Sequence, residues 1–374
     1  MTTNFKIYTS LAILLVVNFI FSFKYLSRLT DYGLHVSIFL VLLQLIVFKY
    51  GGNFFVSIKS KKNISFFFLF ALVCLLSVSH FMIPLESLNV DRWSVISSFL
   101  TEFYNGNYPY FAKSHLGNYP GPMPVYFLIA APFYIIGELS ILSTLGYFLI
   151  TLSFIKKVKQ LANAEFLLFY LFTSLFLVWE ITTRSNIFTY TFLTLLVLHE
   201  FSKLDTQNFR KFTGIAILTG LLLSTRSVYI LPYIIFFLSS LVRREIAFRR
   251  FVLFTSIAIA AFVASFIPIL WGYKDEFFTM NPFIIQSSFL VPELYTLFFI
   301  LISMMLSLFV KSNKDKFFYS GLSLFIAIMI YSIYHVSTIG FQESFFESRV
   351  DISYFIFCTP FLIKYLMDNR VHKA

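Results

Sequence analysis

The sequence predicts an all-α polytopic membrane protein, a single membrane domain covering residues 1–374 and crossing the bilayer about twelve times. Hydrophobic residues make up 58% of the chain and charged residues 13%, and the mean hydropathy is +0.81. Soluble domains are about half apolar and about a quarter charged. Apolar stretches of about 17 to 20 residues recur along the whole chain, which is the length that crosses a hydrocarbon core of about 30 Å.

The apolar stretches divide the chain into candidate spans whose ends are defined to within about two to four residues. They cover 7–23, 33–48, 64–83, 138–155, 165–180, 186–199, 212–224, 228–242, 251–271, 293–310, 317–336 and 350–367. No small-residue cleavage site follows the first stretch, so we expect an uncleaved helix there rather than a signal peptide. A further apolar stretch, 123–136, contains Pro132 and is short for a span, so we expect an interfacial or re-entrant segment.

The basic residues determine the expected orientation. If 123–136 is not counted as a span, the basic clusters all fall on the same side as Lys6, and together they hold 21 of the 29 Lys and Arg residues. These clusters occupy 49–62, 156–159, 203–211, 243–250, 311–316 and 364–373. Basic loops remain in the cytoplasm, so both termini are expected there, in a bacterial inner membrane, with the active face outside.

The net charge of +11 does not predict a nucleic-acid partner. The basic clusters lie between apolar segments, where they would face anionic lipid headgroups, so membrane lipid is the expected partner. Cys74 and Cys358 both lie in apolar spans, which argues against a disulfide framework and a thiolate metal cluster.

Residues 84–137 form a long outer loop that is rich in aromatic residues. Its first part has the spacing of an amphipathic helix, whose polar face begins at Asp91 and would face the space above the bundle. Asp91 and Glu102 share a helix face, but eleven residues separate them by roughly 16 Å. That is too far for a close carboxylate pair, so Asp91 is a lone candidate base and Glu102 a secondary contact.

The rest of this loop contains Asn, His, Tyr, Gly and Pro residues that favour a rigid, shaped segment. Aromatic rings together with amide, imidazole and carboxylate groups are suited to stacking on and hydrogen-bonding a sugar. Twelve of the 18 Asp and Glu residues also fall on the outer side, which is consistent with such a site or simply with soluble loops.

In its order of parts, the chain resembles the membrane-embedded glycosyltransferases of the GT-C superfamily. An Asp follows a membrane helix at 89–93, an aromatic Tyr-Pro-Tyr follows at 108–110, and a proline-rich segment at 119–124 leads into an apolar one at 131–134. The resemblance covers residues 84–160 best. The acid stands alone rather than in a pair, so no metal ligands are assigned and a divalent metal stays open.

The resemblance implies an enzyme that moves a sugar from a polyprenyl-phosphate donor to an outer-face glycan, lipid or protein acceptor. Asp91 would be the general base, because a sugar hydroxyl needs a carboxylate within about 3 Å to accept its proton. Expected substrate contacts are Arg92, Glu102, His115, Tyr119, Asn281 and Gln286. Expected donor-phosphate ligands are the outer arginines Arg184, Arg226 and Arg349, because the arginine fork binds two phosphate oxygens at once.

Simpler interpretations exist for the same residues. An acid at a helix start stabilises the helix dipole, and an outer arginine can reach the lipid headgroups. Two other functions also fit part of the pattern. A surface-polysaccharide polymerase would place its large loop later in the chain, and a transporter or flippase would place charges in the middle of its spans.

Overall fold

The computed structural model describes residues 2–56, 62–157, 164–204, 208–288, 292–347 and 350–369, and all regular structure within these ranges is helical. The first half of the chain forms α1 (Thr3–Leu26), α2 (Gly33–Val56), α3 (Lys62–Ser77), α4 (Ser79–Met82), η2 (Leu85–Ser87), α5 (Arg92–Tyr104), η3 (Pro109–Phe111), α6 (Pro124–Ile136), α7 (Ile141–Lys157), α8 (Ala164–Phe172) and α9 (Leu175–Thr182). The second half forms α10 (Ile187–Phe201), α11 (Phe209–Leu223), η5 (Ser227–Tyr229), α12 (Ile230–Val242), α13 (Phe248–Ala264), α14 (Ile267–Leu270), α15 (Lys274–Thr279), α16 (Pro282–Ser288), α17 (Glu293–Leu308), α18 (Asn313–Ile339), η6 (Gln342–Phe346), η7 (Ile352–Cys358) and α19 (Thr359–Asp368).

Each predicted span overlaps a helix or a pair of consecutive helices. Among the described residues, four helical segments are long and apolar enough to cross a membrane: Thr3–Leu26, Gly33–Tyr50, Phe248–Leu270 and Asn313–Ile339. The all-helical membrane character is therefore confirmed, whereas the count of about twelve spans stays a prediction.

Several helices carry large apolar side chains on their outer surfaces. Leu42 on α2, Ile259 on α13 and Leu301 on α17 are all more than half exposed. Many exposed large apolar side chains are unfavourable in water, and soluble proteins rarely expose large apolar patches. Contact with lipid removes that penalty and explains why the sequence is apolar on these surfaces.

The predicted span 165–180 is broken into α8 and α9 around Ser174, which leaves backbone groups without partners inside the helix pair. The side chain of Asn18 on α1 supplies the missing partners. Its amide nitrogen donates to the Thr173 carbonyl at 3.3 Å, and its amide oxygen accepts from the Leu175 N–H at 3.1 Å. Such a break is tolerated in a membrane only when neighbouring side chains satisfy the freed backbone groups.

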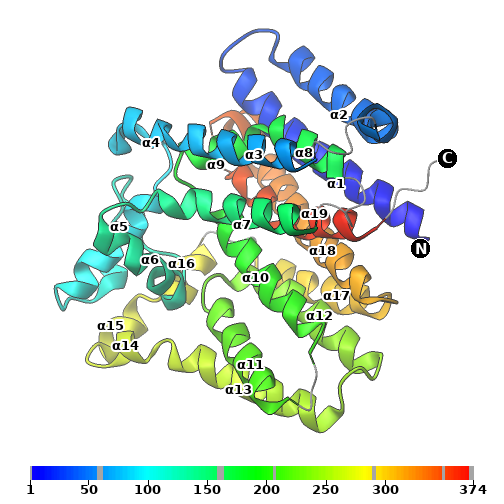
Figure 1. The fold of residues 1–374 in the computed structure, drawn as a ribbon. Coiled ribbons are helices and arrows are strands. Elements are labelled where there is room, and N and C mark those ends of the chain that lie inside the picture. Colours follow the sequence, from blue (N-terminus) through cyan, green and yellow to red (C-terminus); the bar gives the residue numbers. More distant parts are fainter. Residues whose placement is uncertain are drawn as a thin grey trace.

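Figure 1 shows the start of α1 and the end of α19 on one side of the bundle, with α4, α5, α6, α14 and α15 on the opposite side. At the end of the bundle where α1 begins, ion pairs connect residues that are far apart in the sequence. Lys6 bonds Asp315 at 2.6 Å, and Lys316 bonds Glu245 at 2.6 Å. The charge pattern of the sequence predicted all four residues on the same side of the membrane.

The opposite end joins residues from the other set of loops. Arg92 donates to the Ser185 hydroxyl at 2.9 Å, and the Arg28 guanidinium donates to the Phe346 carbonyl at 2.5 Å. Residues that precede 123–136 thus meet residues that follow it at the same end. This is the grouping expected when 123–136 is not counted as a span.

The short apolar segment 123–136 forms α6, and the helix ends at Gly137, which has the left-handed conformation (φ 85°). The axis of α6 lies at 108° to that of Ile141–Phe154, so the two helices do not form one straight span. A glycine at this position allows the reversal without strain, since φ > 0 is unfavourable for residues with a Cβ atom.

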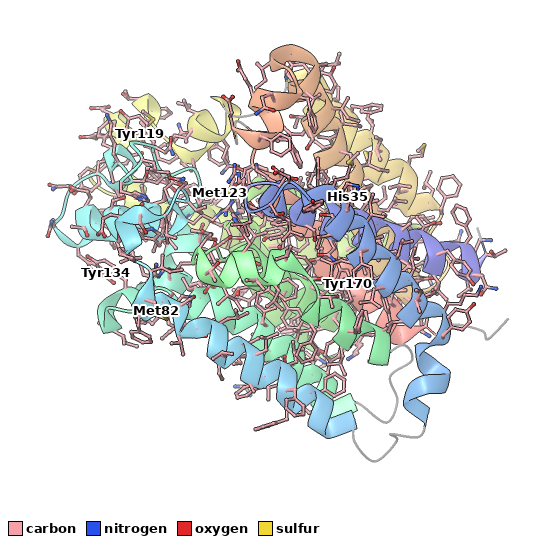
Figure 2. The ribbon with its side chains drawn as sticks, turned by 90° about the horizontal axis from the view of Figure 1, so that it is seen from above. His35, Met82, Tyr119, Met123, Tyr134 and Tyr170 are labelled. Carbon is pink, nitrogen blue, oxygen red and sulfur yellow. The ribbon has the colours of Figure 1, made fainter. Side chains whose placement is uncertain are left out.

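The amphipathic helix predicted in the long loop is α5, but its surroundings differ from the prediction. It packs against η3 and α6, with the Phe99 ring stacked on Phe127 at a centroid distance of 3.5 Å. Ser94, predicted to lie on the open polar face, is buried. In Figure 2, Tyr119, Met123 and Tyr134 mark the same end of the molecule, which the loop builds as a packed layer.

Candidate functional site

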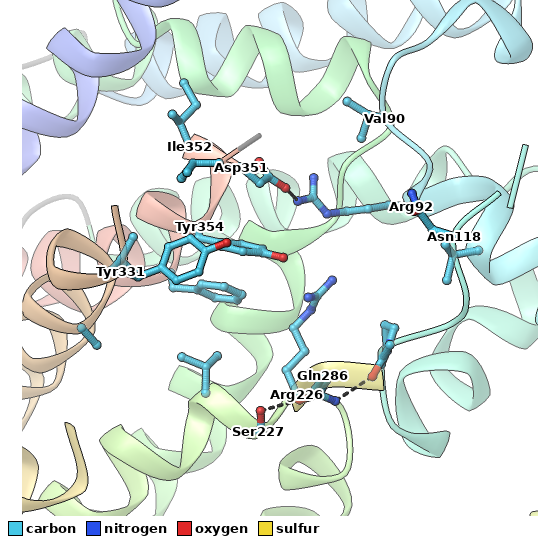
Figure 3. Close-up of a pocket in the computed structure, with 18 of the residues that line it drawn as sticks. Val90, Arg92, Asn118, Arg226, Ser227, Gln286, Tyr331, Asp351, Ile352 and Tyr354 are labelled. Carbon is cyan, nitrogen blue, oxygen red and sulfur yellow. Dashed lines mark hydrogen bonds and ion pairs between the residues drawn. The ribbon is translucent and has the colours of Figure 1, made fainter. Parts of the chain in front are cut away.

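A cavity of about 570 Å³ lies between the long loop and the helices beside it. One part of its wall is polar and comes from the loop, η5, α16 and the start of η7 (Figure 3). The other part is apolar and comes from α12, α17 and α18, including Leu231, Phe299, Ile300 and Ile328. Clefts that combine a mostly apolar wall with a few converging polar groups are typical ligand sites.

Asp91 lies in the polar wall, directly before the first turn of α5. Its side chain makes no capping hydrogen bond to that helix. Instead, its Oδ2 atom accepts from the Ser114 hydroxyl at 2.7 Å and from the Asn118 amide nitrogen at 2.7 Å. Its Oδ1 atom has no hydrogen-bond partner among the described residues, so this oxygen is available to a ligand.

His115 does not line the cavity, although the sequence predicted a substrate contact. Its Nε2 atom lies 2.9 Å from the Leu88 carbonyl, which can only accept, so Nε2 carries a hydrogen. Its Nδ1 atom lies 2.6 Å from the Ser94 hydroxyl of α5, and its ring stacks on Trp93. The imidazole therefore fastens the loop to α5 and so holds the two donors of Asp91 in place.

Arg92 also lines the cavity, but its guanidinium is already bonded to protein. It forms an ion pair with Asp351 and donates to the hydroxyls of Ser185 at 2.9 Å and Ser353 at 2.7 Å. The Asp351 side chain in turn accepts from the Ser353 N–H at 2.9 Å. Arg92 thus connects the long loop to η7, as the dashed line in Figure 3 shows.

Arg226 is the cavity arginine that no carboxylate neutralises among the described residues. Its guanidinium lies over the Tyr126 ring at 5.2 Å and the Phe357 ring at 5.9 Å, and its Nε atom is buried without a hydrogen-bond partner. Figure 3 shows it extending into the cavity beside Tyr354. The buried, unpaired Nε and the absence of a counter-ion favour an anionic ligand here, since unpaired buried charge is costly.

Gln286 and Tyr119, both predicted substrate contacts, line the cavity as well. The Gln286 side chain accepts from the Ser227 hydroxyl at 2.5 Å and donates to the Gly121 carbonyl at 2.6 Å. It therefore joins α16 to both η5 and the proline-rich segment, and it closes one side of the cavity.

The remaining predicted residues lie elsewhere. Glu102 accepts from Asn107, and the Asn281 amide oxygen accepts from the Phe283 and Ile284 N–H groups at the start of α16. Arg184 donates to the carbonyls of His80 and Ile83, and burial lowers the pKa of its guanidinium. Arg349 lies outside the described residues.

Sequence reasoning missed several residues of the cavity wall, notably Lys24, Asn118, Asp351 and Tyr354. A signal existed for Lys24: like Arg226, it is a cation at an outer helix end and breaks the positive-inside bias. No comparable signal existed for Asp351 or Tyr354, because their approach to the loop depends on how the last helices pack.

The residues around Asp91 do not make a metal centre by themselves. No three His, Cys, Asp or Glu side chains come together within the described ranges. Asp351 is bonded by Arg92 and Ser353, which leaves Oδ1 of Asp91 as the available carboxylate oxygen. A divalent cation usually takes one or two carboxylates together with substrate phosphates.

No protein-family model, curated protein or solved structure matches this chain.

Proposed function

We propose that this chain is a glycosyltransferase that moves a sugar from a polyprenyl-phosphate donor to a glycan, lipid or protein acceptor on the outer face of a bacterial inner membrane. One observation carries the proposal: the same half-apolar cavity is lined by a carboxylate with one free oxygen and by an arginine without a counter-ion, as far as the described residues extend. The carboxylate provides a base, and the arginine provides a site for a phosphate.

Asp91 is the general base in this proposal. Its Oδ2 atom is held by Ser114 and Asn118, so the carboxylate is oriented before substrate binds. Oδ1 accepts the proton of the acceptor hydroxyl as that oxygen attacks the anomeric carbon of the donor sugar. Positioned general bases contribute about 10²- to 10⁴-fold to the rate.

Arg226 binds the leaving phosphate. The bond between the anomeric carbon and the phosphate oxygen breaks, its electron pair stays on that oxygen, and negative charge develops there. A guanidinium held over two aromatic rings is pre-oriented for this charge, which stabilises the transition state more than the ground state.

The apolar wall accommodates the lipid part of the donor. Side chains of α12, α17 and α18 form it, and the outer surface of α17 carries exposed apolar residues that suit contact with lipid. A prenyl chain can therefore extend from the phosphate along apolar side chains without leaving a low-dielectric environment.

The proposal is tested in the native cell. The gene is deleted and restored as wild type, Asp91→Asn or Glu102→Gln, and the surface glycans are profiled by mass spectrometry at matched membrane levels of each protein. We expect the deletion to lose a defined sugar, wild type and Glu102→Gln to restore it, and Asp91→Asn to restore less than about 1% of it. Glu102 is the matched control, because it is an acid of the same helix that lies outside the cavity wall.

Full restoration by Asp91→Asn would show that Asp91 is not the base. A deletion that shortens a polymer without removing any sugar would indicate a polysaccharide polymerase instead. An unchanged glycan profile in the deletion strain would refute the transferase itself.

A further inference from the structure

The cavity contains a second buried cation that the proposed function has not yet used. Lys24, near the end of α1, is 1% exposed and lines the cavity. Its Nζ atom makes no hydrogen bond or ion pair with any described residue, and it lies 5.5 Å from the centroid of the Phe345 ring. The carboxylate that acts on it electrostatically, Asp351, is bonded instead by Arg92 and Ser353.

A lysine in such a position is unstable as an isolated charge. Burial without a partner penalises an ammonium strongly, so the group either loses its proton or binds an anion. Within the described structure no such anion is provided by the protein. Lys24 lines the same cavity as Asp91 and Arg226, so an anionic ligand in the cavity can be the partner that the ammonium lacks.

The charges of the described residues that line the cavity support the same conclusion. Among them, Arg92 and Asp351 neutralise each other, which leaves Lys24 and Arg226 against Asp91. A phosphodiester donor carries one negative charge and makes this set neutral. After transfer, Asp91 holds the acceptor's proton and is neutral, while the lipid phosphate carries nearly two negative charges. These two charges balance Lys24 and Arg226, so the set of charges stays neutral throughout. Without Lys24, the low-dielectric site would carry an uncompensated negative charge before and after transfer.

We propose that Lys24 is the second cationic ligand of the lipid-linked phosphate, acting together with Arg226. The inference rests on the proposed function, because it takes the donor to be a prenyl phosphate. Lys24 differs from Arg226 in chemistry: its ammonium is a compact point charge, whereas the guanidinium is a planar fork. The lysine thus supplies charge, and the arginine supplies orientation.

The test uses the purified full-length protein and equilibrium binding of labelled farnesyl phosphate, with farnesol as the uncharged probe. Lys24→Met and Lys24→Gln remove the charge, Lys24→Arg keeps it, and Arg28→Met is the matched control. Arg28 lies one turn further along the chain, is exposed, and does not line the cavity.

We expect both neutral variants to bind farnesyl phosphate about tenfold or more weakly while binding farnesol like wild type, since one charge-assisted contact is lost. Lys24→Arg and Arg28→Met are expected to bind both probes like wild type. Unchanged binding of farnesyl phosphate by the neutral variants would overturn the assignment of Lys24. An equal loss for both probes would overturn it too, because that is the result of a purely structural role.

Two further arms separate the inference from the proposed function. If wild type does not prefer farnesyl phosphate to farnesol, both the role of Lys24 and the class of donor are wrong. If wild type does prefer farnesyl phosphate and the neutral Lys24 variants bind it like wild type, the role of Lys24 is wrong and the donor class survives. Inorganic phosphate is expected to compete poorly, since it cannot use the apolar wall; competition equal to that of unlabelled farnesyl phosphate would show a site for free phosphate and overturn the lipid-linked ligand.

Discussion

At the scale of single residues, Arg92 illustrates how a tertiary contact changes the role expected from sequence. Its position next to Asp91 predicted a substrate contact. In the structure its guanidinium is engaged by Asp351, Ser185 and Ser353, and its side chain is 9% exposed. The arginine therefore holds the long loop against η7, and its charge is already compensated before a substrate enters.

This ion pair provides a prediction about stability. We expect Asp351→Asn to lower the free energy of unfolding by about 2 kcal/mol, because it leaves a buried guanidinium without its counter-ion. The value is below that of a fully buried pair, since the Asp351 side chain is 39% exposed. Thermal unfolding in detergent measures it, with Arg92→Met and the double variant completing a cycle. A coupling energy near zero would contradict the structural role of the pair.

Asp91 illustrates the opposite case, in which the local context excluded the simpler interpretation. An acid at the start of a helix ordinarily accepts a hydrogen bond from that helix. Here Ser114 and Asn118, more than twenty residues further along the chain, bond it instead. The loop thus folds back and holds one oxygen of the Asp91 carboxylate. A residue that only capped the helix would not need these bonds.

At the scale of helices, close packing of α11 and α13 depends on a glycine. A Cβ atom added at Gly220 would lie 2.0 Å from the backbone oxygen of Ala258, whereas at Gly214 of the same helix nothing lies within 4 Å. Small residues allow two membrane helices to approach closely, and this approach replaces the hydrophobic driving force that lipid does not provide.

We therefore expect Gly220→Ala to destabilise the protein by about 1–3 kcal/mol, as overpacking generally does, and Gly214→Ala to leave stability nearly unchanged or slightly higher. Cys358 is buried and Cys74 is exposed, so a Cys74→Ser background leaves one buried thiol that reports unfolding to a thiol-reactive dye. Equal melting temperatures for the two glycine variants would show that α11 and α13 are not packed as described.

At the scale of the whole molecule, the loops gather into two sets at opposite ends of the bundle. Lys6 meets Asp315 and Lys316 meets Glu245 at one end, and Arg92 meets Asp351 at the other. The division matches the one obtained from the charge pattern alone. By the positive-inside rule we expect the set rich in Lys and Arg to lie in the cytoplasm, and this orientation would make the cavity face outward.

Cysteine labelling tests this orientation. In a background without Cys74 and Cys358, single cysteines replace the exposed Lys113 and Lys311. We expect a membrane-impermeant maleimide to label the cysteine at 113 in intact cells and the cysteine at 311 only after permeabilisation. The reverse pattern would place the cavity on the cytoplasmic face and would remove the outer acceptor from the proposed function.

The sequence by itself determined the all-helical membrane class and the approximate position of the long apolar helices, and it predicted two sets of loops. These properties follow from local quantities, because hydropathy over a window sets whether a segment can enter lipid, and charge between segments sets its orientation. The sequence also singled out the long loop with Asp91 as candidates for a site, and Arg226 as well, since an arginine at the outer side departs from the distribution of the other basic residues.

Only the tertiary structure decided which of the candidate residues share a cavity. Arg184 and Asn281 resemble Arg226 and Gln286 in type, and Glu102 and His115 are predicted on the same side of the membrane. All four nevertheless hydrogen-bond backbone or neighbouring side chains outside the cavity wall. Lys24 and Asp351 stand near opposite ends of the chain and meet at the cavity through the packing of α1 and η7. Side-chain partners at such sequence distances depend on how helices pack against each other, and helix packing is not encoded in any local window of residues.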